Sequence, residues 1–277
     1  MSEQRLIVVV GATDQGCASA HPRHELSQVK RAAVSTPDLR QPSELAVANV
    51  HDTGSLDATF AGAHAVFGMT ANQKEPGELL MTEEDMKHDI VAGKNMINAA
   101  KKNGVKHFVF SSLPDIIKGS NNKFKGAIIM NNKVEIEKLA RRELDGYTGI
   151  IPGNFFTNLH WPMYTRLQPD GSVRLCDPIG ADKRTQWLDG GRDTGLFVAR
   201  IFALGVEKTK NKNYIAGGKL LFVNDIMETF THVTGGLAQA ARGTLWDPAS
   251  SAQDCTATAQ YCFVRAQEKR QGAHAWA

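Results

Sequence analysis

The sequence predicts an α/β fold built around a doubly wound parallel sheet. Short apolar runs alternate along the first half of the chain with segments whose apolar residues recur at helical spacing. The first run, Leu6–Val10, is rich in β-branched residues and ends at Gly11, which is typical of a strand buried on both faces of a parallel sheet. Because strands and helices alternate, helices are expected to cross over between neighbouring parallel strands.

Three later apolar runs have the length of buried strands and end at Gly, Ser or Pro. They are Ala65–Gly68, His107–Ser111 and Gly149–Pro152. Between them, Asp85–Lys101 carries one apolar stripe at helical spacing and is followed by Gly104 as a stop signal. The segment Lys133–Leu144 repeats this pattern. These segments complete the expected alternation of strands and amphipathic helices.

The alternation weakens in the second half, which divides the chain into three expected regions. Residues 1–152 form the sheet domain, residues 153–236 form a smaller C-terminal cap on the substrate side, and residues 237–277 form an atypical tail. Within the cap we expect a loop at residues 169–180 and a helix at residues 193–204. The tail is rich in Ala, Gln, Ser and Arg and has few branched aliphatic residues, so disorder is its simpler interpretation.

Composition and charge exclude several classes of protein. The chain has 277 residues, 42% of them hydrophobic and 22% charged, as expected for a globular protein. Its net charge of +3 includes no basic stripe, which argues against nucleic-acid binding, and its apolar runs are too short to span a membrane. Four scattered cysteines without a C-x-x-C pair indicate a reducing compartment, and the nine histidines show no metal-binding spacing. We therefore expect a cytoplasmic protein without a metal, and entry into the nucleus is also compatible.

A glycine-rich loop, Gly11–Gly16, directly follows the first apolar strand, where dinucleotide-binding folds place their phosphate loop. Glycine lets the backbone approach a pyrophosphate, and the N-terminus of a following helix supplies N–H groups and partial positive charge. An ordinary turn from strand to helix explains two glycines about equally well. The position of the loop, after an apolar strand near the N-terminus, favours the dinucleotide interpretation.

Four further motifs follow in the order of a known family. They are Gly62–Thr70, Gly104–Asp115, Lys133 with Val134 and Glu135, and Pro152–Asn158. On these motifs the chain, from about Leu6 to about Gly236, resembles the NmrA-like family of atypical short-chain dehydrogenase/reductases. The resemblance implies a Rossmann-type fold and a nicotinamide cofactor, NADP with NAD as the alternative.

The resemblance also implies which residues contact the cofactor. The expected contacts are Gly11, Ala12, Thr13, Asp14, Gln15 and Gly16 at the pyrophosphate, Asn49 near the adenine, Thr70 beside the cofactor, Lys133 at the nicotinamide ribose, and Phe155, Phe156, Thr157 and Asn158 on the nicotinamide side. Lys133 is in addition the expected catalytic residue, because a desolvated cation in a cleft can bond ribose hydroxyls and approach the proton-transfer range. The alternative is a solvated lysine at the start of a helix.

The chain departs from the family pattern at three places. The glycine-rich loop is one residue shorter than the family's and has Asp14 in place of the middle glycine, so a carboxylate faces the pyrophosphate. The tyrosine that reductases place four residues before the lysine is replaced by Ile129. The second-strand region, residues 29–39, lacks an arginine where the family grips a 2′-phosphate, although Arg31 and Arg40 are close in sequence. Selectivity for NADP over NAD therefore does not follow from the sequence.

Two functions from different classes are consistent with these residues. The first is an oxidoreductase that passes hydride between the cofactor and a small organic substrate, as in tailoring steps of fungal secondary metabolism, with Ser111 and Ser112 either contacting substrate or merely ending a strand. The second is a catalytically silent redox sensor that binds the dinucleotide and regulates a protein partner such as a transcription factor. The missing phenol at Ile129 favours the sensor. The enzyme is favoured because many members of the family resemble tailoring reductases, and because the tail is unlike the C-terminal segment of the family.

We predict that replacing Asp14 with Gly strengthens cofactor binding, because the change removes a negative charge facing the pyrophosphate and frees the turn for positive φ. Calorimetry with NADP at two salt concentrations measures the gain, which should shrink as salt screens the charge. Equal affinities of Asp14→Gly and the parent at low salt would indicate instead that Asp14 caps the following helix.

Overall fold

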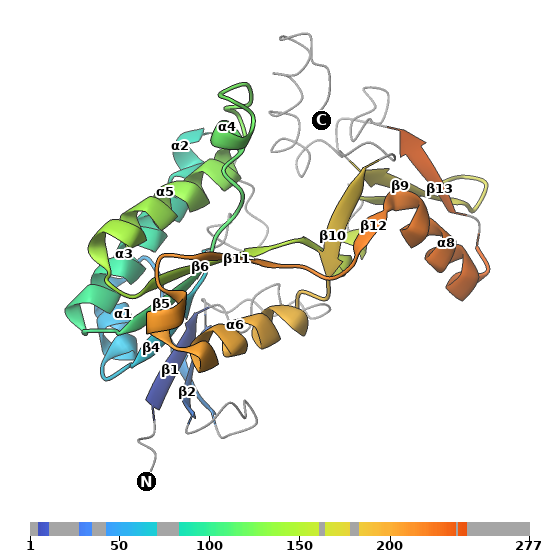
Figure 1. Cartoon of the computed structure of the whole chain (residues 1–277). Helices are drawn as coiled ribbons and strands as arrows, with labels where there is room; N and C mark the ends of the chain where they lie inside the picture. The colour runs from blue at the N-terminus through green and yellow to red at the C-terminus, as the bar shows by residue number, and fades with distance from the viewer. Residues whose placement is uncertain are drawn as a thin grey trace.

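A computed structural model describes residues 5–10, 28–34, 43–70, 83–160, 164–177, 183–236 and 238–242 of the chain. Its centre is a seven-stranded sheet (Figure 1). In spatial order the strands are β11 (Asn213–Ala216), β6 (Tyr147–Pro152), β5 (His107–Ser111), β4 (Ala65–Gly68), β1 (Arg5–Val10), β2 (Gln28–Val34) and β3 (Ser43–Val47). The strands from β11 to β1 pair in parallel, which confirms the α/β fold with a parallel central sheet.

The edge formed by β2 and β3 differs from the predicted parallel winding. β2 pairs antiparallel with β1, and β3 pairs antiparallel with β2. Val10 at the end of β1 lies opposite Val29 near the start of β2, so these two strand ends meet at the same edge of the sheet. Antiparallel neighbours need no crossover between them, unlike the parallel strands of the rest of the sheet. β3 again runs in the direction of β1, because two antiparallel pairings restore the direction.

Helices cover both faces of the sheet (Figure 1). On one face lie α1 (Thr53–Phe60), α3 (His88–Lys102) and α5 (Ile128–Glu143), and on the other lies α6 (Asp193–Leu204). α6 has the predicted bounds, whereas α5 begins more than one turn before its predicted start at Lys133. The helices α3 and α5 both start at the edge where the parallel strands end, since each follows its strand and runs back across the sheet.

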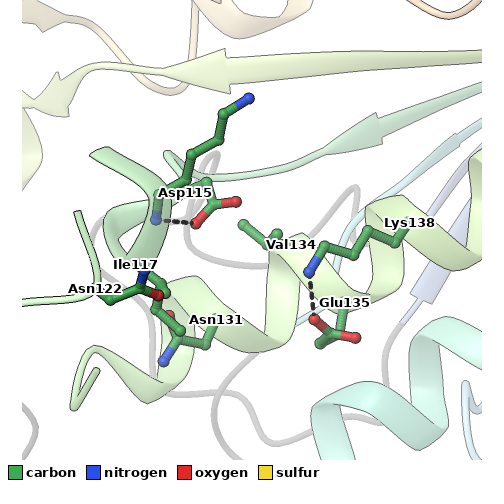
Figure 2. Close-up of a pocket in the computed structure, with 8 residues that line it drawn as sticks. Asp115, Ile117, Asn122, Asn131, Val134, Glu135 and Lys138 are labelled. Atoms are coloured by element: carbon green, nitrogen blue, oxygen red, sulfur yellow. Dashed lines mark hydrogen bonds and ion pairs between the residues drawn. The ribbon is translucent and has the colours of Figure 1, made fainter. Parts of the chain in front are cut away.

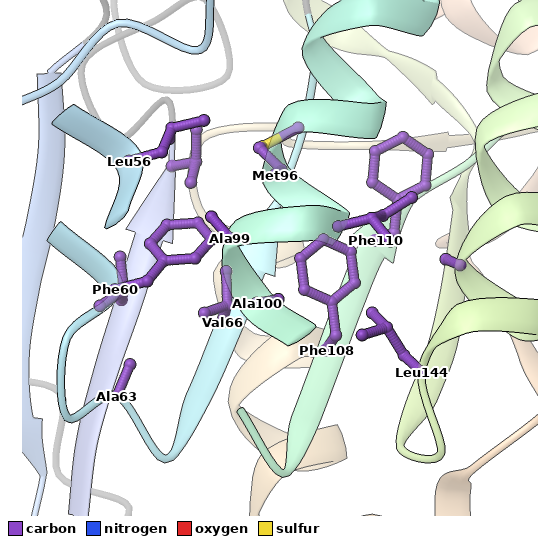
Figure 3. Packing of buried hydrophobic residues seen from close by; sticks show 14 of the residues in the cluster. Leu56, Phe60, Ala63, Val66, Met96, Ala99, Ala100, Phe108, Phe110 and Leu144 are labelled. Atoms are coloured by element: carbon purple, nitrogen blue, oxygen red, sulfur yellow. The ribbon is translucent and has the colours of Figure 1, made fainter. Parts of the chain in front are cut away.

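The larger hydrophobic core lies between the sheet and α1, α3 and α5 (Figure 3). Phe108 and Phe110 of β5 point into this core, whereas Val109 between them packs on the opposite face with α6. α3 contributes Met96 together with the small residue Ala100, which lets the helix lie close to the strands. This alternation buries β5 on both faces, as its continuous apolar run predicts.

The helix predicted at Asp85–Lys101 is interrupted near its start. α2 (Glu83–Met86) ends before Lys87, and α3 begins at His88. The His88 Nδ1 atom lies 2.9 Å from the carbonyl oxygen of Asp85. The His88 side chain therefore bonds a carbonyl oxygen that would accept from a main-chain N–H in a continuous helix. The spacing of apolar residues does not predict this competition.

The remaining elements form a smaller lobe beside the main sheet (Figure 1). Its strands form two three-stranded sheets, one of β12 (Leu220–Phe222), β10 (Arg184–Leu188) and β7 (Asn154–Phe155), the other of β13 (Ala238–Arg242), β9 (Val173–Asp177) and β8 (Thr165–Leu167). The helix α8 (Val223–Thr234) packs against both sheets through a third apolar cluster, which includes Ile226, Leu175 and Trp187.

This lobe does not coincide with the predicted cap at residues 153–236. β11 and α6 fall within that range but belong to the main sheet and to its covering layer. β9 occupies part of the loop predicted at residues 169–180, because it finds a partner in β13 that local sequence does not show. β13 itself lies in the predicted tail, residues 237–277, so at least residues 238–242 of that region form a strand.

A buried histidine ties the main sheet to α7 (Val206–Thr209). The His107 side chain is buried, and its Nε2 atom lies 3.1 Å from the hydroxyl oxygens of both Thr148 and Thr209. Both hydroxyls donate to main-chain carbonyls, so Nε2–H of a neutral ring is the donor in these contacts. Burial, with a smaller contribution from His64, lowers the pKa of His107 to about 4.

We predict that the free energy of unfolding decreases as the pH falls from about 6.5 to about 4, because His107 stays neutral in the folded chain while the unfolded chain takes up a proton. The loss is absent above this window and reaches about 3 kcal/mol at its lower end. Denaturant unfolding at several pH values measures it. His107→Gln cannot take up the proton and should decline less steeply, and equal slopes for the two proteins would contradict the assignment.

Candidate functional site

Several predicted cofactor residues lie at the carboxyl edge of the sheet, where ligands of open α/β folds bind. Thr70 follows β4, Ser112 follows β5 and the segment 153–158 follows β6. The first turns of α3 and α5 lie at the same edge. Three strand ends and two helix starts therefore lie at this edge, and the side chains of Thr70, Asp89 and Lys133 meet there.

Lys133 and Thr70 are in direct contact at this edge. The Lys133 ammonium donates to the main-chain carbonyl oxygen and to the hydroxyl oxygen of Thr70. A third contact, 3.3 Å long, joins Lys133 Nζ to Oδ1 of Asp89 in the first turn of α3. All three N–H groups of the ammonium therefore have acceptors within the protein. The Lys133 side chain is 9% exposed and that of Asp89 is 2% exposed, so the two form a buried ion pair.

Close packing of α3 on α5 positions this pair. Asp89 and Gly93 lie about one turn apart on α3, and Lys133 and Ile136 lie about one turn apart on α5. A Cβ atom on Gly93 would lie 2.5 Å from Ile136 Cγ1, which is closer than van der Waals contact. Glycine at this position lets the helices approach, and the approach brings the carboxylate of Asp89 to the amine of Lys133.

Asp89 is the site residue that sequence reasoning missed. It lies on the buried face of α3, which also carries Ala92, Gly93 and Met96. A carboxylate on the buried face of a helix needs a hydrogen-bonded or charged partner, because an unpaired buried charge is costly. This rule could have identified Asp89 from the sequence, because a carboxylate on a buried helix face requires a partner. Lys133, the lysine of the family motif, is the first candidate for that partner.

The environment of Lys133 alters its acid–base behaviour. Burial lowers the pKa of Lys133, while the charge of Asp89 and its hydrogen bond act in the opposite direction. The amine is therefore a cationic hydrogen-bond donor that lies nearer the proton-transfer range than a solvated lysine does. The second carboxylate oxygen of Asp89, Oδ2, is buried and has no hydrogen-bond partner among the described residues, so it is an unused acceptor beside the amine.

Asn49 lies beyond the end of β3, and its side chain already has a partner. The Oδ1 atom accepts from the main-chain N–H of His51 at 2.8 Å, and the main-chain N–H of Asn49 donates to Ser55 Oγ at 3.0 Å. These bonds shape the turn before α1, whose first turn is capped by Asp52. In the structure the hydrogen bonds of Asn49 stabilise this turn. Its contact with adenine stays a prediction.

The predicted segment on the nicotinamide side follows β6 as the motif implies. Phe155 in β7 packs against the smaller core on the α6 face, whereas Phe156 is 40% exposed and stacks on Trp187 with ring centroids 5.6 Å apart. Thr157 and Asn158 lie half-buried on the short 3-10 helix η1 (Phe156–His160). Phe156 therefore presents an apolar surface, while Phe155 has a packing role.

Two further sequence candidates lie near Lys133. Ile129 occupies α5 one turn before Lys133, so the structure holds an aliphatic side chain where reductases place a phenol. Ser112 is fully buried and donates to Glu137 Oε2 at 2.6 Å, which turns its hydroxyl toward α5. The glycine-rich loop, residues 11–16 with Asp14, lies outside the described residues.

A surface hollow of about 260 Å³ lies between α4 (Ile116–Gly119) and α5 (Figure 2). Asp115 in its wall accepts from the main-chain N–H of Lys118 at 2.9 Å. Lys138 in its wall pairs with Glu135 at 2.8 Å. Because Lys138 and Glu135 are largely exposed, water weakens their interaction with a ligand, and the hollow offers weaker anchors than the buried lysine does.

Two kinds of site find no support in the part of the chain that the structure describes. No three His, Cys, Asp or Glu side chains gather there in a way that could hold a metal ion. None of the helices in the described ranges combines the length and the apolar character needed to cross a membrane.

The sequence profile of the NmrA-like family matches residues 4–244 of the chain, which extends past Gly236, where the motif resemblance was expected to end. The nitrogen metabolite repression protein nmr of Neurospora crassa is 32% identical over 159 residues, which are 55% of this chain and 32% of that protein. An NmrA-like family domain-containing oxidoreductase of Aspergillus hancockii is 33% identical over 143 residues, which are 47% of this chain and 41% of that protein. The chain thus matches well under two thirds of either relative.

Solved structures of NmrA, a negative transcriptional regulator, share the fold. The complex of NmrA with NAD aligns with a TM-score of 0.60 at 20% identity, over 79% of this chain and 66% of that chain. The complex with NADP aligns with a TM-score of 0.60 at 21% identity, over 77% of this chain and 64% of that chain. At these identities the likeness shows a shared fold.

We predict that Thr70→Val lowers the free energy of unfolding by about 1.5–3 kcal/mol, because it removes a hydroxyl acceptor from a buried ammonium. Thr59→Val is the matched control. Thr59 is equally buried, but its hydroxyl donates to the neutral main-chain oxygen of Ser55, so its loss should cost about 1 kcal/mol or less. Denaturant unfolding measures both, and equal losses would contradict a charge-assisted bond at Thr70.

Proposed function

The chain belongs to the NmrA-like family, and on that premise we propose that it is an NAD(P)(H)-dependent oxidoreductase acting on a small organic substrate. The observation that carries the proposal is the buried Lys133 amine held against Thr70 at the carboxyl end of β4. In an open α/β sheet this edge is where a dinucleotide lies. A desolvated lysine beside a strand end is also a common mark of a functional site.

The donor set at this edge fits a nicotinamide dinucleotide. Lys133 supplies a cationic N–H donor for the ribose hydroxyls, and the unused Oδ2 of Asp89 supplies an acceptor nearby. Phe156 supplies an exposed apolar face on the segment that follows β6. The pyrophosphate is assigned to the glycine-rich loop, Gly11–Gly16, on the sequence motif alone.

The bound cofactor would supply the hydride, and the residues of the chain would position it and manage the proton. Lys133 would hold the nicotinamide ribose, and its position at the end of β4 would keep the reactive ring near the segment that follows β6. Since Ile129 removes the phenol that usually donates the proton, that proton would come from Lys133, from water or from the substrate. The lowered pKa of Lys133 supports its part in such a step.

The family context suggests the biological setting of this activity. The relative from Aspergillus hancockii is named an oxidoreductase of the same family, which supports a reductase with a small-molecule substrate. A tailoring step of fungal secondary metabolism is the setting that we propose, with NADP as the cofactor and NAD as the alternative. The enzyme would act in the cytoplasm.

A second function, a redox sensor that regulates a protein partner, is favoured by two observations. Ile129 stands one turn before Lys133 where a reductase has its phenol, so the site lacks the usual acid. The relative from Neurospora crassa is named a nitrogen metabolite repression protein. In this alternative the chain would bind the dinucleotide as a signal and act on a partner such as a transcription factor, including in the nucleus.

We predict that Lys133→Ala weakens NADP or NAD binding by about tenfold or more, the factor that 1.4 kcal/mol represents, because it removes the cationic donor. Calorimetric titration measures the loss, with thermal melting to confirm that the variant is folded. Lys138→Ala is the matched control, since Lys138 lies on the same helix with its side chain 62% exposed and should bind like the parent. A change below about twofold at Lys133 would remove it from the cofactor site.

Turnover separates the two functions. Purified chain is mixed with NADPH or NADH and a panel of carbonyl and imine substrates, and cofactor oxidation is followed. Oxidation that Lys133→Ala abolishes supports the oxidoreductase. Dinucleotide binding without oxidation of any substrate in the panel supports the sensor.

A further inference from the structure

The ion pair of Asp89 with Lys133 differs in its surroundings from the ion pairs at the surface. In the pair of Lys102 with Asp57, which links α3 to α1, the lysine side chain is 70% exposed. Exposed pairs of this kind contribute little, because water solvates both charges. Asp89 and Lys133 are shielded from water, so each charge depends on the other for its stabilisation.

Thr70 and Asp89 act differently on the Lys133 amine. Thr70 supplies two oxygen acceptors without a charge, whereas Asp89 supplies a full negative charge. Burial lowers the pKa of Lys133, and the charge and hydrogen bond of Asp89 raise it again. The N-terminus of α3 carries a partial positive charge, which favours a carboxylate in its first turn. Removing the charge of Asp89 would leave the amine with its neutral acceptors and without the counter-charge that the described residues supply.

Among the described residues, α2 packs on α5 beside Lys133 through a polar but neutral contact. α2 meets α5 through Asn132, whose side-chain amide donates to the carbonyl oxygen of Met86 at 2.9 Å. The charged Glu84 of α2 pairs with Lys87 at the surface. In the part of the chain that the structure describes, Asp89 is therefore the charged partner that favours the protonated form of Lys133.

The Asp89 contact is also the one that a ligand can replace most easily. At 3.3 Å it is the longest of the three contacts of Lys133 Nζ. An ammonium has three N–H groups, so an incoming hydroxyl must displace one acceptor. Displacing Oδ1 of Asp89 keeps the carboxylate close enough to balance the charge, whereas displacing the carbonyl of Thr70 takes the donor away from a buried main-chain oxygen.

We propose that Asp89 is a positioning residue, which keeps the Lys133 amine charged and aligned at the end of β4 so that it presents an N–H donor to a hydroxyl of the bound dinucleotide. The ligand in this statement rests on the proposed function, but the effect of Asp89 on Lys133 is measurable without a ligand. An Asp89 that served only helix packing would leave the titration of the amine unchanged.

Nitrogen NMR of the chain labelled with 15N-lysine follows the titration of Lys133 directly, and Lys133→Met assigns the signal. Asp89→Asn keeps the shape and removes the charge, so the amine should lose its proton at lower pH than in the parent. Asp89→Glu restores the charge and should bring the titration back toward that of the parent. Asp57→Asn breaks the exposed pair with Lys102 and should leave the Lys133 signal unchanged.

Calorimetric titration of the same variants with NADP across a range of pH tests the consequence for binding. Above the pH at which the amine of Asp89→Asn loses its proton, affinity should be about tenfold weaker than in the parent. At lower pH, where both amines are charged, the difference should close. A loss of affinity that is the same at every pH would indicate a packing role and overturn the proposal.

The outcomes also separate this proposal from the proposed function. If the parent binds NADP, Lys133→Ala loses that affinity and Asp89→Asn titrates and binds like the parent, the role of Asp89 is wrong and the cofactor site stands. If the parent binds no dinucleotide, the proposed function and the ligand named here are both wrong. The NMR titration still shows whether the charge of Asp89 acts on the Lys133 amine.

If Asp89→Asn does not fold, NMR titration of the parent chain tests the proposal instead. The carboxyl carbon of Asp89 should then shift at the pH where the Lys133 nitrogen titrates, because the two charges are in contact. Absence of that shared inflection would overturn the proposal.

Discussion

The close packing of α3 on α5 is the constraint on which the candidate site depends. Gly93 lets the two helices approach at Ile136, and the same approach brings Asp89 to Lys133. The ion pair is not what holds the helices together, because the desolvation of two charges is of the same order as their attraction. Burial of Ile136 and Met96 in the larger core supplies the favourable free energy, and the charged pair occupies a position that the apolar contacts fix.

Successive turns of α5 bond to β4, β5 and β11 or to the residues at their ends, which fixes the helix relative to the sheet. Lys133 donates to Thr70 at the end of β4, and one turn later Glu137 accepts from Ser112 at the end of β5. One further turn along, Arg141 bonds Glu137 Oε1 at 2.9 Å and Asn213 Oδ1 of β11 at 2.7 Å. A shift of the helix along its axis would break the bonds to Thr70, Ser112 and Asn213 together, so the position of the Lys133 amine is defined by more than its own contacts.

The parts of the structure that the sequence predicts best are those with local signals. β4 and β5 have the predicted bounds because each is a continuous apolar run ended by a small residue. Lys133 and Thr70, which the family motifs assign to the cofactor site, are in contact in the structure, and their contacts with a cofactor stay a prediction. The sequence predicts a loop where β9 lies, because its partner β13 is far along the chain. The apolar members that define the helical stripe of α3 do not point to Asp89. Pairings between distant segments decide these features, and a single sequence contains them only indirectly.

The same geometry that suits Lys133 for binding limits how it can transfer a proton. All three of its N–H groups are engaged, so a substrate or cofactor reaches a proton only by replacing an acceptor, and the contact with Asp89 is the longest. Once the amine gives up its proton, the carboxylate of Asp89 is left as an unpaired buried charge, which is costly. Proton donation by Lys133 is therefore favourable only when the amine quickly regains a proton from another source, such as a relay through water. With Ile129 in place of a phenol, no neutral acid on that turn of α5 relieves this cost. A substrate that carries its own acid, or that accepts hydride without prior protonation, matches this site better than a simple ketone does.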